Sequence, residues 1–212
     1  RYLSWEDIWS YPIYKERGTL PGDYKYLDWN GDGEINDQDQ HPIAFDQTPW
    51  FNYSFTFDAT YKNGDLSRLL QGSALGSMEY KEALYGIWGS NGGGTLTQYL
   101  DRWRPVDPLA DPWDPSIEWI SGYYGFTGNY PRANSGFNRV STAYLRLKSI
   151  EIGYTLPKLR SFSSMDLRLF ANAYNLLTFT GVKFVDPEHP DDELGRLYPL
   201  NKTFTVGLSL KF

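Results

Sequence analysis

TFTVGLSLKF, residues 203 to 212, is the stretch that decides the fold. Its side chains alternate strictly between apolar residues and polar or small ones. The apolar parity holds Phe204, Val206, Leu208, Leu210 and Phe212. Successive side chains of a β-strand point to opposite faces, so this stretch predicts a strand with one apolar face and one polar face.

The same period of two recurs upstream. Four further stretches predict strands: residues 53 to 62, 65 to 73, 143 to 156 and 165 to 174. Asn63-Gly64 stands between the first two and is the strongest short hairpin signal, so these strands form a tight hairpin. Within the third stretch the apolar parity changes between Leu147 and Ile150, and a β-bulge there restores a single apolar face.

The connections between these strands are alternately short and long. The short ones are Asn63-Gly64 and residues 157 to 164, and the long ones are residues 1 to 50, 74 to 142 and 176 to 202. Short turns at one end and long loops at the other are typical of outer-membrane β-barrels. A soluble β-sandwich also alternates, so alternation alone does not separate the two all-β folds. The loop asymmetry favours the barrel.

A calcium-type loop lies in the first long connection, where residues 28 to 39 read DWNGDGEINDQD. Calcium loops of twelve residues supply oxygen ligands from positions 1, 3, 5, 7, 9 and 12, with a glycine at position 6. The predicted metal ligands are Asp28, Asn30, Asp32, Glu34 through its carbonyl, and Asp39, with Asn36 holding a water and Gly33 at the turn. The alternative is a simple run of turns, because Asn, Asp and Gly favour turns.

Composition excludes several classes of protein. The chain has 212 residues, no cysteine and a formal charge of −6, which excludes disulfides and thiolate metal sites and argues against a nucleic-acid partner. Two isolated histidines, His41 and His189, leave little for a zinc site or a catalytic triad. No apolar run is long enough for a transmembrane helix.

Several short motifs follow one another in a specific order. They are Pro21-Gly22-Asp23 before the calcium-type loop, residues 57 to 72 with the hairpin, Arg102-Trp103-Arg104-Pro105, residues 144 to 148, residues 153 to 157, residues 175 to 179, Asp186-Pro187-Glu188 and Tyr198-Pro199-Leu200. Together they cover most of the chain. In this order the chain resembles the C-terminal part of SusC/RagA-type TonB-dependent outer-membrane transporters.

The resemblance implies the C-terminal strands of a 22-stranded antiparallel transmembrane β-barrel, filled by an N-terminal plug. It also implies a bacterial outer-membrane location, a SusD-like surface lipoprotein as partner, and import of an oligosaccharide or peptide driven by TonB. The chain holds neither the plug nor a TonB box, so we expect it to be the C-terminal piece of a longer protein. Residues 51 to 73 are then a barrel hairpin and residues 143 to 212 three further strands, with the long connections at the cell surface.

The 74 to 142 loop is rich in aromatic residues, which suit sugar stacking and protein contacts. Trp88, Trp113 and Trp119 are the predicted substrate-binding residues, against the alternative that such rings pack the loop against itself. Acidic residues also cluster in the loops, but solvated charge or a cation site explains them better than catalysis, so no enzyme activity is expected. The alternative function is a secreted calcium-dependent carbohydrate-binding β-sandwich.

Overall fold

The computed structural model describes residues 1–14, 18–80, 97–126, 135–157, 165–189 and 198–211. The chain folds into two compact units. The first unit comprises Arg1–Ile43 and Tyr80–Asn138, and the second comprises Ala44–Glu79 and Arg139–Phe212. The second unit holds the main sheet, and the first holds the calcium-type loop.

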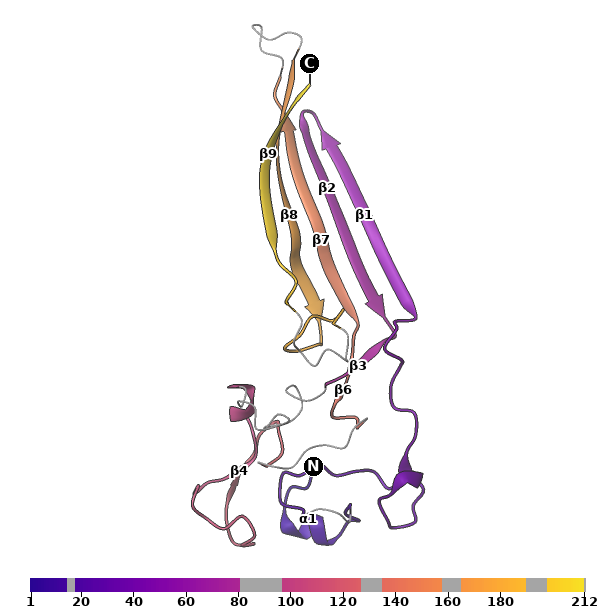
Figure 1. Cartoon of the computed structure of the whole chain (residues 1–212), viewed down its shortest axis with the longest axis vertical. Helices are drawn as coiled ribbons and strands as arrows, with labels where there is room; N and C mark the ends of the chain where they lie inside the picture. The colour runs from indigo at the N-terminus through magenta and orange to yellow at the C-terminus, as the bar shows by residue number, and fades with distance from the viewer. Residues whose placement is uncertain (15–17, 81–96, 127–134, 158–164, 190–197, 212) are drawn as a thin grey trace. The chain divides into compact units, whose positions relative to one another are not determined.

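The second unit is built on one antiparallel sheet of five strands, in the order β1-β2-β7-β8-β9 (Figure 1). The strands are β1 (Phe51–Tyr61), β2 (Gly64–Ala74), β7 (Tyr144–Thr155), β8 (Asp166–Thr180) and β9 (Thr203–Lys211). Neighbours in the sheet are also successive long strands of the chain, as expected of hairpins and meanders. The all-β antiparallel fold is therefore confirmed.

The first hairpin turns one residue earlier than predicted. Its two loop residues are Lys62 and Asn63, and Gly64 already pairs with Tyr61 on one side and Tyr154 on the other. Lys62 has a φ of 54°, so it supplies the left-handed backbone that a tight turn needs and leaves Gly64 free to join the ladder.

A bulge in β7 keeps the apolar residues of this strand on one face of the sheet. Leu70 of β2 pairs with Leu147 and Leu69 pairs with Ser149, so Lys148 is the extra residue. This register shift confirms the bulge expected from the parity change. Without it, the apolar residues on the two halves of β7 would point to opposite faces.

Strand β8 is longer than predicted, because it continues past the residues that lie opposite the bulge of β7. Tyr174 pairs with Ser149 and Leu177 with Leu147, and Asn175 between them has a φ of 53°. The strand therefore continues to Thr180 instead of ending near residue 174. An isolated left-handed asparagine costs little backbone strain, and the strand resumes with Leu177 and Phe179 on the same face as Ala171 and Ala173.

Paired residues of an antiparallel sheet share a face, so the register sorts the side chains into two sets. We call one set the apolar face: Phe51, Tyr53, Phe55, Phe57, Ala59, Tyr61, Leu66, Leu70, Leu145, Leu147, Ile150, Ile152, Tyr154, Leu167, Leu169, Ala171, Ala173, Leu177, Phe179, Phe204, Val206, Leu208 and Leu210, with Arg68 as its one charged paired member. The other set, the polar face, includes Asp58, Asp65, Ser67, Gln71, Ser73, Tyr144, Arg146, Glu151, Arg168, Asn172, Thr178 and Thr205.

The apolar face carries large exposed side chains. Ile152 lies on the central strand β7, yet its side chain is 60% exposed, and Val206 on β9 is 85% exposed. On the polar face the side chains of the outer strands β1 and β9 are exposed as well, whereas on the inner strands Arg146 is 1% exposed and Ser73 is 4% exposed. A continuous exposed apolar surface of this extent marks a contact with lipid or with another apolar surface, rather than with water.

Smaller elements lie outside the main sheet. In the second unit, β3 (Ser77–Glu79) pairs with β6 (Arg139–Ser141). In the first unit, β4 (Arg104–Pro105) pairs with β5 (Trp119–Ile120), and the helices are α1 (Trp5–Trp9), η1 (Asp37–Asp39) and η3 (Thr97–Leu100). In the parts of the chain that the structure describes, no helix has the length and apolar character to cross a membrane.

Candidate functional site

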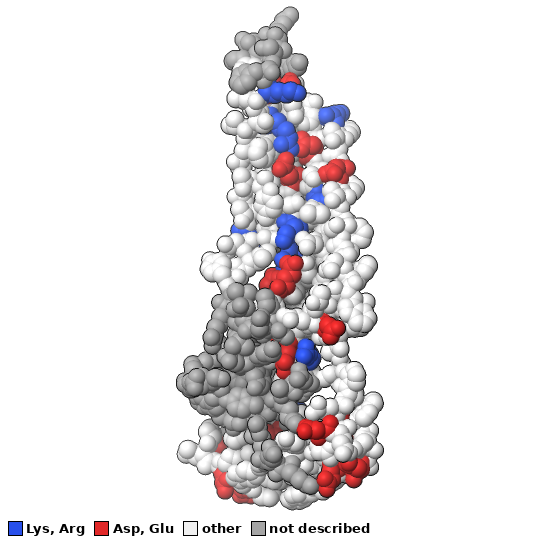
Figure 2. Space-filling model, turned by 45° about the vertical axis from the view of Figure 1, so that its right-hand side comes forward, with Lys and Arg blue, Asp and Glu red and all other residues white. Residues whose placement is uncertain are grey.

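Charged residues gather on the polar face of the sheet, and Figure 2 shows them as a stripe of blue and red side chains. Arg168 of β8 bridges two strands: it contacts both carboxylate oxygens of Asp65 on β2, with Nε 3.1 Å from Oδ1, and its Nη2 lies 2.7 Å from Oε1 of Glu151 on β7. Asn172 donates to the other oxygen of Glu151 at 3.4 Å. These side chains keep about a third of their surface exposed, so the cluster contributes little stability and serves mainly to make this face hydrophilic.

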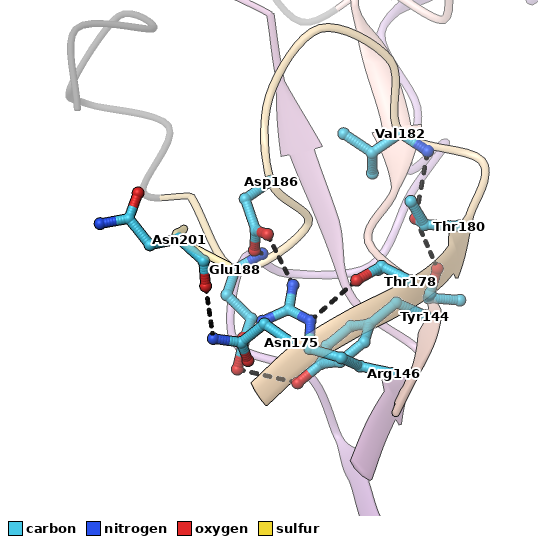
Figure 3. Close-up of polar contacts among 10 residues, drawn as sticks. Tyr144, Arg146, Asn175, Thr178, Thr180, Val182, Asp186, Glu188 and Asn201 are labelled. Atoms are coloured by element: carbon cyan, nitrogen blue, oxygen red, sulfur yellow. Dashed lines mark hydrogen bonds and ion pairs between the residues drawn. The ribbon is translucent and has the colours of Figure 1, made fainter. Parts of the chain in front are cut away.

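A second cluster, nearer the other end of the strands, is centred on Arg146 of β7 (Figure 3). Arg146 Nη1 lies 2.6 Å from Oε2 of Glu188, and Nη2 lies 2.6 Å from Oδ2 of Asp186. Its Nε donates to Thr178 Oγ1 on β8 at 3.0 Å. The hydroxyl of Tyr144 donates to Oε1 of Glu188 at 2.8 Å.

This Arg146 cluster determines where the connection after β8 lies. Asp186 and Glu188 both belong to that connection, and the same guanidinium binds both carboxylates, so the segment folds back onto the polar face of β7 and β8. A charge as buried as that of Arg146 is tolerated only when it is paired and hydrogen-bonded. Sequence reasoning did not assign this role to Arg146. The available signal was an arginine on the polar parity of a strand.

The calcium-type loop in the first unit is closed by its own carboxylates. Asp28 accepts from the backbone N–H of Gly31 at 2.7 Å and of Gly33 at 2.9 Å, while Asp32 accepts from the N–H of Glu34 at 2.8 Å. The side-chain oxygen of Asn30 accepts from the N–H of Asp32 at 2.9 Å. Gly33 has a φ of 82°, in the left-handed region that favours glycine, so the sharp turn assigned to it is present.

Asp39 joins the two ends of this loop. Its carboxylate accepts from the backbone N–H of Asn36 at 2.8 Å and of Trp29 at 2.8 Å. These bonds, with that from Asn36 the stronger influence, lower the pKa of the Asp39 carboxyl below its usual range, because they stabilise its ionised form. Ile35, the expected apolar anchor of the loop, is buried at 6% exposure.

The donor set of the loop fits a hard cation, because it offers carboxylate and amide oxygens on a short segment held in a tight turn. Among the described residues, no three His, Cys, Asp or Glu side chains lie grouped as metal ligands. Calcium ligation by Asp28, Asn30, Asp32, Glu34 and Asp39 therefore stays a prediction.

The predicted substrate-binding tryptophans lie in different surroundings. Trp113 is 53% exposed, and its ring centroid lies 6.4 Å from that of Trp5. Trp119 of β5 is half-buried and meets the ring of Phe126 edge to face at 5.4 Å. Trp88 lies outside the described residues. Of the two that are described, Trp113 presents more surface to a ligand.

A cavity of about 630 Å³ lies beside the calcium-type loop in the first unit, and no sequence pattern indicates it. Its wall includes Tyr24, Tyr26, His41 and Phe137 together with Asn36 and Asp39 of the loop. A volume of this size is within the range of small-molecule sites, and its aromatic wall with a few polar groups matches their usual character.

Comparison with known proteins identifies the chain. No protein-family model matches it. It is 30% identical over 208 residues to the TonB-dependent receptor P3 of Formosa agariphila, an alignment that covers 91% of this chain. The chain belongs to the TonB-dependent receptors. It spans about a fifth of the length of receptor P3, 19% of which is aligned.

Solved structures support the receptor fold of this chain. The RagAB peptide importer in its open-open state matches with a TM-score of 0.58 at 21% identity, over 91% of this receptor chain and 20% of the matched chain. The RagAB peptide transporter matches with a TM-score of 0.60 at 21% identity, over 85% and 19%. At this identity the likeness establishes the fold of the described chain and no more.

The Arg146 cluster predicts a specific loss of order. Arg146→Met leaves the carboxylates of Asp186 and Glu188 without their cation, which costs about 3 kcal/mol, the lower end of the range for a broken buried pair, because both carboxylates are partly exposed. Hydrogen exchange of the full-length receptor should then be about a hundredfold faster over residues 181 to 189. Lys202→Met, which removes an exposed cation, is the control, and unchanged exchange in the Arg146 variant would contradict the assigned role.

Proposed function

We propose that the chain is part of a TonB-dependent outer-membrane importer of large nutrients, oligosaccharides or peptides, which works with a SusD-like surface lipoprotein. The observation that carries the proposal is the two-faced sheet: its apolar face is exposed, whereas the ion pairs of Arg168 and Arg146 lie on the opposite face. A barrel that carries polar cargo through lipid needs this inverted arrangement, with an apolar exterior and a hydrophilic interior.

The sheet by itself is incomplete. Within the described residues, β1 and β9 are each paired along one edge only. A strand edge cannot be left open in lipid, because each unpaired N–H or C=O there costs several kcal/mol. The proposal therefore includes further strands that close the barrel, in keeping with the 22 strands expected from the resemblance, and a plug within it that TonB engages.

The partner and cargo follow from the comparison, as part of the same proposal. RagAB is a peptide importer. A SusD-like lipoprotein on the cell surface would contact the long loops, and the aromatic residues of residues 74 to 142 suit either a peptide or a glycan. Trp88, Trp113 and Trp119 remain the substrate-binding candidates. Catalysis has no place in the proposal, since import requires binding and release without a chemical change.

The orientation places the long connections outside. In this proposal the tight turn at Lys62 and Asn63 and the connection after β7 face the periplasm, and residues 1 to 50, 74 to 142 and 181 to 202 face the cell surface. Short periplasmic turns and long external loops are the rule in outer-membrane barrels. The Arg146 cluster then lies at the external end of the strands, where it holds an external connection against the barrel interior.

Calcium is proposed as a structural ion of the first external connection. The ligands are Asp28, Asn30, Asp32, Asp39 and the carbonyl of Glu34. The support is the ordered turn at Gly33, the buried anchor Ile35 and the Asp39 carboxylate, which joins the two ends of the loop through the N–H groups of Trp29 and Asn36. External calcium at millimolar levels would fill even a weak site of this kind. The ion would reduce the conformational freedom of a long loop and take no part in transport.

The import role predicts a selective defect in uptake. Cells without the full-length gene should lose uptake of one labelled class, peptides or oligosaccharides, and recover it with the gene restored. In restored cells that carry Trp113→Ala, uptake should fall by about fivefold, because the exposed ring no longer stacks on cargo. Trp50→Ala is the matched control, since that ring is also highly exposed. Equal uptake of every class with and without the gene would refute the import role.

The calcium site predicts a loss of metal without a loss of fold. Asp28→Ala combined with Asp32→Ala should weaken calcium binding by at least about tenfold, because two carboxylate ligands are lost from one loop. Calorimetric titration of the full-length receptor measures the affinity. Asp37→Ala, in the same loop but outside the ligand positions, should bind as the unaltered protein does. Equal affinity in the double variant and the Asp37 control would rule out these ligands.

A further inference from the structure

One charged residue interrupts the apolar face. Arg68 of β2 pairs with Phe57 on β1 and with Ile150 on β7. Along its own strand, the nearest residues on the same face are Leu66 and Leu70. Both strands that flank β2 are described, so the surroundings of Arg68 on this face are complete, and they are apolar on every side.

The guanidinium of Arg68 has an aromatic contact and remains open on its outer side. Its Cζ lies 4.4 Å from the centroid of the Phe57 ring, and the side chain is exposed. None of the paired residues of the apolar face is acidic. The nearby carboxylates of Asp58, Asp65 and Glu151 belong to the polar face, where two of them bind Arg168. Arg68 thus presents an unneutralised charge to whatever covers this face.

Lipid tails cannot satisfy this charge. An arginine on the lipid face of a barrel is destabilising, increasingly so toward the middle of the bilayer, and the guanidinium does not deprotonate to avoid the penalty. A cation–π contact with Phe57 offsets part of this penalty but leaves the five N–H donors without acceptors. An anion with several oxygens in one plane or fork matches those donors best, and phosphate is such an anion.

The position of Arg68 along β2 indicates which leaflet of the outer membrane it faces. Tyr61 and Tyr154 flank the tight-turn end of the apolar face, where aromatic rings mark the membrane interface. Phe57 lies four residues from Tyr61. At the rise and tilt of barrel strands this places Arg68 about 10 Å from the interface. Phosphate is thus within reach when the side chain extends toward the interface and the bilayer thins locally.

We propose that Arg68 binds the phosphate group of a phospholipid in the periplasmic leaflet, with Phe57 stacked against the guanidinium. The site is an annular lipid site on the outer wall of the barrel, separate from any cargo site. It rests on the membrane placement and orientation given under the proposed function, and it is independent of the cargo. If detergent extraction showed that the receptor is not a membrane protein, the placement would fail before Arg68 was tested.

Native mass spectrometry of the full-length receptor, with phosphatidylglycerol as the probe, tests the site. After a delipidating detergent wash, the unaltered receptor should retain one phosphatidylglycerol molecule. Arg68→Met should lower the retained fraction by at least about tenfold, since the charge-assisted bonds are lost. Arg68→Lys should fall between the two, because an ammonium keeps the charge but loses the planar fork. Methionine suits a lipid-facing position, so the variant should fold.

Lys62→Met is the matched control, because Lys62 is a cation of the adjacent tight turn with an aromatic contact of its own. It should leave retention unchanged, and an equal loss in this control would overturn the proposal in favour of non-specific attraction. Unchanged retention in Arg68→Met would also overturn it. A parallel wash with lipid A as probe distinguishes the leaflets: dependence on Arg68 for lipid A alone would refute the periplasmic assignment. Release of a bound protein by Arg68→Met, with lipid unaffected, would overturn it too, by showing that a protein covers this face.

Discussion

The register across β2, β7 and β8 is the constraint on which the rest of the sheet depends. Its period of two would fail at residue 148 if the bulge did not place Leu147 and Ile150 on one face. A slip of one residue moves every side chain of a strand to the other side, so without the bulge one half of β7 would be inverted and either Arg146 or Glu151 would lie on the apolar face. Asn175 makes the matching adjustment in β8. Two local irregularities therefore preserve a property of the whole wall.

The faces of the sheet reverse the usual arrangement of a protein domain. In water the apolar side would be buried, and the ion pairs of Arg168 and Arg146 would lie outside. Here Arg146, which is 1% exposed, lies on the polar face of β7. Its carboxylate partners, Asp186 and Glu188, come from the connection that follows β8. Burial of the Arg146 charge is feasible because two carboxylates and a threonine hydroxyl bind its guanidinium.

The sequence predicts what depends on local alternation. The strands, the bulge near residue 148 and the apolar parity of Phe204 to Leu210 all follow from the period of two, and the order of the short motifs indicates the family. The predicted end of β8 is six residues early. Asparagine favours turns, whereas here Asn175 adopts a left-handed backbone within the strand, and the pairing with β7 continues on both sides of it.

Contacts between distant residues are beyond sequence reasoning. Arg146 and Glu188 are 42 residues apart, and no local pattern connects them. The cavity beside the calcium-type loop likewise combines Tyr24 with Phe137. For the calcium-type loop the sequence supplies the ligand types and the turn at Gly33, because both are encoded within twelve residues. Metal affinity depends on how far the carboxylates reorient from their backbone partners, and local sequence does not encode that.

Contact between the apolar face and lipid is the central claim, and β9 offers the most direct measurement of it. The chain has no cysteine, so spin labels can be placed one at a time along β9 of the full-length receptor in bilayers, after replacement of any cysteine elsewhere. We predict that labels at Phe204, Val206, Leu208 and Leu210 collide preferentially with oxygen, which concentrates in lipid, whereas labels at Thr205 and Ser209 do not. Collision rates without this period of two, or with the opposite phase, would contradict it.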